Sequence, residues 1–85
     1  MVMPLLTSQQ MSLFRVMMRW PVASVDVLSN VLQRSRELQD PDTHLRVQVH
    51  RMRKRLANIG ITIETVWGVG YRIPQRGALL SQVAA

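Results

Sequence analysis

The chain contains 85 residues, 47% hydrophobic and 19% charged, which suits one small globular domain with a modest core and excludes a disordered basic tail. Eleven lysines and arginines against five acids give a formal net charge of +6, and ten of the eleven are arginine, the residue best suited to bidentate contacts with phosphate and guanine. The absence of cysteine excludes disulfides, thiolate metal sites and a thiol nucleophile.

No apolar run approaches the roughly 20 residues that a membrane-spanning helix needs. The first six residues lack the basic start and the long apolar stretch of a signal peptide. We therefore expect a cytoplasmic protein, and its positive charge makes acidic polymers the expected partners.

The first helix is predicted to begin after Thr7, because Thr7 followed three residues later by Gln10 is the pattern of a reciprocal capping box. It should run to about Trp20, since Pro21 disfavours helical geometry at the residue before it. Two adjacent groups of residues are predicted to make one wide apolar face. They are Met11, Phe14 and Met18, with Leu13, Met17 and Trp20 beside them.

The second helix is predicted to start with Ser24 as its N-cap and Asp26 in its first turn, where an acid suits the helix dipole. It should fade near Gln33, and the polar segment from Arg34 to Pro41 is predicted to be a loop with at most one helical turn. The side chains expected to point inward are Val25, Leu28, Val31 and Leu32. Asp40 and Asp42 flank Pro41, where capping is the ordinary role of a carboxylate and acid–base chemistry is improbable.

The third helix is predicted from an apolar stripe with spacings of four, three and four residues, which is the repeat of one helical face. This stripe consists of Leu45, Val49, Met52 and Leu56. The opposite face carries Thr43, Val47, His50, Arg51 and Lys54; His44, Gln48 and Arg55 lie on one shoulder, and Arg46 and Arg53 on the other. Asp42 or Thr43 is expected to cap the start, and Gly60 supplies a left-handed exit.

A hairpin is predicted after Gly60, because Ile61, Ile63 and Thr65 alternate with more polar residues at the two-residue period of a half-buried strand. Residues 71–73 should pair back across a turn at 67–70, whose two glycines we attribute to turn geometry. Residues 22–23 are a candidate third strand. The fold class is therefore α+β, with three helices, a C-terminal hairpin and a small two- or three-stranded sheet.

The basic outward face of the third helix suits the major groove of duplex DNA, which is wide enough to admit one helix. On that face Arg51 and Gln48 are the expected base readers. Two plainer interpretations stay open: a solvated basic surface, and an amphipathic helix lying on a membrane. The membrane interpretation is the weaker one, because a domain of this size needs the apolar stripe in its core.

Other chemistry is disfavoured by spacing. His44 and His50 are six residues apart and do not form the i, i+4 pair of a helical zinc site. The glycines at 68 and 70 lack the third glycine and the lysine of a phosphate-binding loop. No serine, histidine and carboxylate form a recognisable nucleophile system. We expect no enzyme activity, no metal and no cofactor.

The segments from Thr43 to Leu56 and from Ile63 to Ile73 resemble the C-terminal DNA-binding domain of OmpR/PhoB-type response regulators. The most specific parts are the RMRKRL stretch at 51–56 and the TVWGVGYR stretch at 65–72, in the family's order and separation. The resemblance covers roughly 6–74. We accordingly divide the chain into an N-terminal extension (1–6), a DNA-binding domain (7–74) and a tail (75–85).

The resemblance implies a winged helix-turn-helix, in which the third helix (43–58) enters the major groove and the hairpin (61–74) is the wing, reaching a neighbouring minor groove or the backbone. Carried over by position, the groove-facing residues are Thr43, His44, Val47, Gln48, His50 and Arg51. Lys54 and Arg55 would position phosphates, and the wing falls on 67–72, with Trp67 and Arg72 as its expected contacts.

Departures from the family's pattern bear on function. The chain begins almost at the first helix, so we expect neither a receiver domain nor the sheet that usually precedes that helix, and some apolar surface of the first helix is exposed or shared with a partner. Trp67 stands where an arginine is frequent, and Arg46 where an acid is frequent, so the family's sequence preference is not inherited. Trp67 either wedges against a minor groove or, as is commoner for a hairpin tryptophan, packs on its own domain.

These features predict a small transcriptional regulator that binds double-stranded DNA sequence-specifically, as a homodimer on repeated half-sites. Family likeness adds a contact with RNA polymerase through the loop from Gln33 to Pro41, with Arg34 and Arg36. The alternative is a winged-helix module that binds a regulator or RNA polymerase instead of DNA, through Trp67, an uncovered first helix and an apolar tail. In that tail, leucine and valine either pack across a dimer or remain disordered.

Overall fold

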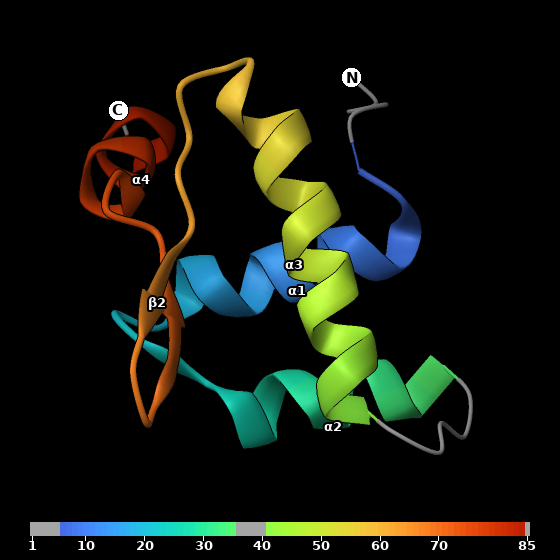
Figure 1. The fold of residues 1–85 in the computed structure, drawn as a ribbon. Helices are drawn as coiled ribbons and strands as arrows, with labels where there is room; N and C mark the ends of the chain where they lie inside the picture. Colours follow the sequence, from blue (N-terminus) through green and yellow to red (C-terminus); the bar gives the residue numbers. More distant parts are fainter. Residues whose placement is uncertain (1–5, 36–40, 85) are drawn as a thin grey trace.

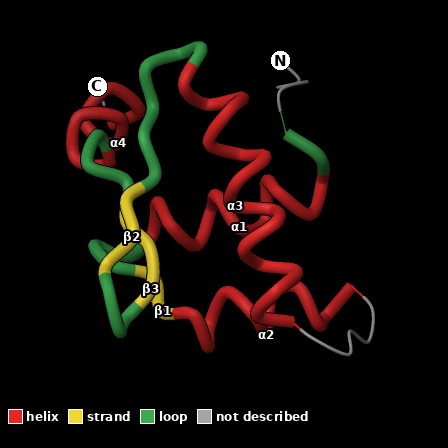
Figure 2. The backbone as a smooth tube through the Cα atoms, viewed as in Figure 1, coloured by secondary structure: helices red, strands yellow, loops and turns green. Residues whose placement is uncertain are grey.

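The computed structural model of the protein describes residues 6–35 and 41–84. The elements follow in the order α1 (Ser8–Arg19), β1 (Ala23–Ser24), α2 (Val25–Ser35), α3 (Pro41–Ala57), β2 (Glu64–Val66), β3 (Gly70–Arg72) and α4 (Arg76–Ala84). In Figure 1, α3 crosses in front of α1, and α2 lies across the lower end of α3. The hairpin and α4 lie to one side of these helices, as Figure 2 also shows. The predicted α+β winged helix-turn-helix is confirmed, with a fourth helix at its end.

Helix α1 begins at the predicted capping box. The Thr7 hydroxyl accepts from the Gln10 amide at 3.1 Å, and the Gln10 side-chain oxygen accepts from the Thr7 amide at 3.2 Å. The predicted wide apolar face is present, but its residues are unequally buried. The completely covered positions are Leu13 and Met17, with Gln10 nearly so, whereas three other residues of the predicted face are only partly buried. Those partly buried residues are Met11, Phe14 and Met18.

The most buried face of α1 includes a polar residue, Gln10. Positions 10, 13 and 17 share one helical stripe. Because the side chain at position 10 is polar, a pattern based on hydrophobicity does not identify this stripe as the most buried one. Trp20, expected to flank the apolar face, is the C-cap residue and is 51% exposed.

Helices α2 and α3 pack on α1 and on each other. Ser24 caps α2 as predicted, accepting from the Val27 amide at 3.2 Å. Helix α3 begins at Pro41, earlier than expected, so Asp42 and Thr43 lie inside its first turn and do not cap it. A proline suits this first helical position, because its missing N–H would have no partner within the helix. Asp42 accepts a hydrogen bond from the Ser29 hydroxyl at 3.2 Å, which links α3 to α2.

Helix α3 ends in a Schellman motif. The Gly60 amide donates to the Ala57 carbonyl at 3.2 Å and the Ile61 amide to the Leu56 carbonyl at 3.0 Å. Gly60 has φ +77°, the left-handed conformation that glycine adopts without a steric penalty. Because Ile61 and Leu56 are both buried, the motif also directs the chain from α3 back into the core.

The three strands form an antiparallel sheet in the order β1-β3-β2, which confirms the third strand. In the register, Tyr71 faces both Ala23 and Thr65, so β3 is the central strand. Gly68 has φ +78°, as the turn requires. Gly70 does not have a positive φ, so the prediction that turn geometry requires both glycines is wrong for this one. A Cβ at position 70 would lie 1.9 Å from the Ala23 carbonyl oxygen. Its role is to let β1 approach β3.

The C-terminal tail is helical, not disordered, over Arg76–Ala84. Arg76 joins α4 to the end of α1, because its Nε donates to the Met18 carbonyl at 2.6 Å and its Nη2 to the Arg19 carbonyl at 2.9 Å. These carbonyls lie in the last turn of α1, where helical partners run out. Leu79 packs partly on the core. Leu6, the first described residue of the chain, is also buried. No described helix is long and apolar enough to cross a membrane.

The close approach at Gly70 predicts that Gly70→Ala destabilises the fold by about 3 kcal/mol or more, because the methyl group meets backbone atoms of β1 that cannot move aside. Gly77→Ala is the matched control: no atom lies within 4 Å of its Cβ position, and alanine in a helix should stabilise by roughly 0.5–1 kcal/mol. Chemical denaturation of the three proteins measures both effects. Equal stability of Gly70→Ala and the parent chain would contradict the packing of β1 on β3.

Candidate nucleic-acid interface

Helix α3 separates a buried face from a polar one, as predicted. The apolar stripe is almost completely buried, with Leu45 and Val49 at 1% exposure and Met52 and Leu56 at none. The residues of the opposite face are all exposed. They are Thr43, Val47, His50, Arg51 and Lys54. Within 6–35 and 41–84, the Arg51 and Lys54 side chains make no hydrogen bond or ion pair, so their charges are available to a partner.

Gln48, predicted to read bases, is directed inward instead. It is only 7% exposed, and its side-chain oxygen accepts a hydrogen bond of 2.9 Å from the Gln10 amide group. Gln10 therefore closes the capping box of α1 and also holds α3 at a fixed rotation. The helical wheel placed Gln48 on a shoulder, and the bulk of α1 covers that shoulder. His44, on the same side, is half-buried and lies 3.3 Å from the Gln9 side-chain oxygen.

The other shoulder of α3 faces the hairpin. Arg46 is exposed and lines an open groove of about 410 Å³ between α3 and the wing. The lining also includes Asp26 at the start of α2 and Asp42 of α3. The opposite wall includes Trp67 and Gly68. The predicted site did not include Arg46, although its shoulder position and its exposure make it a further candidate.

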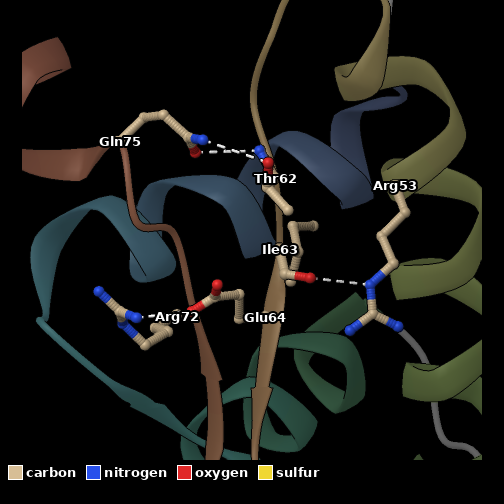
Figure 3. A network of polar contacts seen from close by, with 6 residues as sticks. All are labelled: Arg53, Thr62, Ile63, Glu64, Arg72 and Gln75. Carbon is tan, nitrogen blue, oxygen red and sulfur yellow. Dashed lines mark hydrogen bonds and ion pairs between the residues drawn. The ribbon is translucent and has the colours of Figure 1, made fainter.

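Arg53, on the same shoulder as Arg46, is turned toward the hairpin and is half-buried. Its Nε donates to the Ile63 carbonyl at 2.9 Å, as drawn in Figure 3, and its Nη2 donates to the Thr65 hydroxyl at 2.9 Å. Its guanidinium carbon also lies 5.8 Å from the centre of the Tyr71 ring. The helical wheel placed Arg53 on a shoulder of the outward face, and its side chain bonds to the domain itself.

The tip of the hairpin presents Trp67, which is 89% exposed. The interpretation that Trp67 packs on its own domain is therefore wrong. The turn that carries it is closed by a hydrogen bond of 3.0 Å from the Val69 amide to the Val66 carbonyl. Val69 is itself tied to the domain, because its carbonyl accepts from the Val25 amide at 3.0 Å. The backbone of the tip is thus held, while the indole projects into solvent.

Arg72, the other expected wing contact, lies at the base of the hairpin. It forms an ion pair with Glu64, its direct neighbour across the strands (Figure 3). Both side chains are close to half exposed, so solvent screens the pair and it adds little to stability. The pairing does lower the charge that Arg72 offers to a partner.

Among the residues that the structure describes, no three His, Asp or Glu side chains are grouped closely enough to hold a metal ion. His44 and His50 differ in burial, since one is half-buried against α1 and the other is exposed on the opposite face.

A helix-turn-helix with a basic outward helix face and a projecting hairpin defines the winged-helix class of DNA-binding domains. Comparison with protein families matches the model described as "Transcriptional regulatory protein, C terminal" over residues 4–73. The chain belongs to this family, so it contains a DNA-binding domain of a transcriptional regulator, of the OmpR/PhoB type. Comparisons with curated proteins and with solved structures give no significant match.

The burial of Gln48 predicts that Gln48→Ala lowers stability and leaves base preference unchanged. Removing its oxygen strands the buried Gln10 amide group, which should cost roughly 1–3 kcal/mol in the free energy of unfolding. Thermal or chemical denaturation gives the first quantity, and competition among duplexes differing at single base pairs gives the second. A stable Gln48→Ala protein with altered base preference would restore Gln48 as a reader.

Proposed function

We propose that this protein binds specific double-stranded DNA sequences through α3 and the wing, and that it regulates transcription from those sites. The observation that carries the proposal is the pair Arg51 and Lys54, which bond to no other described residue and lie on the exposed face of a helix whose other face is buried in the core. Arginine can donate two parallel hydrogen bonds to guanine, and lysine neutralises phosphate as a point charge.

Within this proposal, the residues of α3 divide by their position along the helix. Thr43, Val47, His50 and Arg51 face the base edges, with Arg46 added from the groove side. Lys54 and Arg55, near the C-terminal end of α3, contact the phosphate backbone. Gln48 is not among the proposed base contacts because it is buried, and His44 is at most a peripheral contact because it is half-buried.

The wing reaches the minor groove next to the major groove that holds α3. Trp67 is its leading side chain: it has no charge, so it would contribute by apolar contact with sugars or by partial insertion between bases. Arg72 would contact the backbone only after exchanging its pairing with Glu64 for a phosphate.

The proposed binding unit is a homodimer on DNA. One recognition helix contacts too few base pairs to be selective alone, and half-sites about one helical turn apart would allow two copies to bind the same face of the duplex. Contact with RNA polymerase through the loop between α2 and α3 is also proposed from family likeness. Residues 36–40 of that loop lie outside the described part of the chain.

The competing proposal, a protein-interaction module, is favoured by one observation: large apolar side chains are exposed outside α3. Trp67 is 89% exposed, Trp20 51% and Val22 37%. Exposed tryptophans are frequent at protein interfaces. We prefer DNA because a protein partner gives no reason for the concentration of arginine and lysine on the outward face of α3.

The division of roles predicts different defects in two variants. Arg51→Ala should weaken binding to the preferred site by roughly 1–3 kcal/mol and relax the preference at one base pair. Lys54→Ala should weaken binding to all sequences alike and reduce the slope of log K against log salt by about one. Titration of preferred and scrambled duplexes at several salt concentrations separates the two. Equal, sequence-independent losses from both variants would remove Arg51 as a reader.

A further inference from the structure

Side-chain links at three places hold the hairpin, two of them connecting parts of the hairpin to each other and one joining it to α3. Figure 3 shows these links around the strands. Gln75 bonds Thr62 through both its amide atoms, at 3.0 and 3.2 Å, which connects the entry and exit of the hairpin to each other. Glu64 and Arg72 pair across the strands. Arg53 alone of the three extends from the recognition helix.

The contacts of Arg53 fall on both sides of the hairpin. Its guanidinium bonds the Ile63 carbonyl and the Thr65 hydroxyl on the β2 side and lies over the Tyr71 ring on β3. Thr65 and Tyr71 are direct partners in the strand register. The next pair toward the tip is Val66 with Gly70, which leads into the turn that carries Trp67. The Arg53 contacts therefore extend from Ile63 to the strand pair next to the one that leads into the turn.

We propose that Arg53 is a positioning residue that fixes the wing at a set distance from α3, so that Trp67 and the reading face of α3 can engage adjacent grooves together. The inference rests on the proposed function for the identity of the ligand, but the positioning itself is a property of the free protein. Two binding elements held in place before association lose less conformational freedom on binding than two that move independently.

The guanidinium suits this role because its donors are rigid and planar. One group spans an oxygen of the backbone and an oxygen of a side chain two residues later, while its face rests near an aromatic ring. A lysine has the same charge but lacks the two diverging N–H donors of the guanidinium, so it would donate a hydrogen bond to only one of the two oxygens. This difference makes Arg53→Lys a graded variant, and Arg53→Gln the variant that removes the charge and the diverging donors together.

The first test measures the geometry without DNA. Because the chain has no cysteine, spin labels can be placed at His50→Cys on α3 and Val69→Cys on the wing, both exposed positions. The distance distribution between them should be narrow in the parent chain, broad with Arg53→Gln and intermediate with Arg53→Lys. Gln75→Ala is the matched control, since it removes a hairpin link that does not involve α3. An unchanged distribution in both Arg53 variants would overturn the proposal.

The second test is a double-mutant cycle on a duplex enriched from a random library. Trp67→Ala should weaken binding about tenfold in the parent chain and in Gln75→Ala, but less than about twofold in Arg53→Gln, because a wing that is not positioned gains little from its tip. The salt slope should be unchanged by Arg53→Gln, since a lower slope would indicate a direct phosphate contact and contradict positioning. Additive losses from Trp67 and Arg53 would also overturn it.

The tests distinguish failure of this inference from failure of the proposed function. If the parent chain enriches no duplex, DNA recognition fails, and the spin-label distances still decide whether Arg53 positions the wing. If Arg53→Gln does not fold, as shown by its thermal transition, Arg53→Lys carries both measurements. Normal DNA binding with no coupling between positions 53 and 67 would reject the positioning role alone.

Discussion

The burial of one face of α3 is the constraint on which the rest of the structure depends. Leu45, Val49, Met52 and Leu56 lie in the core against α1 and α2, so the rotation of the helix about its own axis is fixed by packing. The Gln10–Gln48 hydrogen bond adds a directional restraint to this apolar contact, since a small rotation of α3 would separate two buried polar groups. The basic face then points outward as a consequence of the core.

The position of the wing relative to α3 is set by three local contacts. The Schellman motif at Gly60 sends the chain from α3 into β2, and the absent side chain at Gly70 lets β1 complete the sheet. Arg53 connects α3 to the resulting hairpin. The two elements of the proposed interface, α3 and the wing, are therefore held in relation to each other by the turn at Gly60, the strand pairing at Gly70 and the Arg53 guanidinium.

Much of this could be predicted from the sequence, because caps, stripes and glycine exits are local signals. The α1 capping box, the Ser24 cap and the α3 stripe are read from spacing alone. Gln48, Arg53 and Gly70 could not be, since their roles depend on which other segment lies against them: α1 for Gln48, the hairpin for Arg53 and β1 for Gly70. Helix α4 was missed for a similar reason, as its apolar pattern is weak and its anchor, Arg76, bonds carbonyls more than fifty residues away in the chain.

The central claim is that the outward face of α3, with the wing, reads a DNA sequence. Selection from a randomised duplex library, followed by titration of the enriched and scrambled duplexes at two salt concentrations, tests it most directly. The account predicts a shared motif, repeated as half-sites, bound at least about a thousandfold more tightly than its scramble. No enrichment, with only weak and salt-sensitive binding to any duplex, would contradict sequence-specific recognition and favour a protein partner.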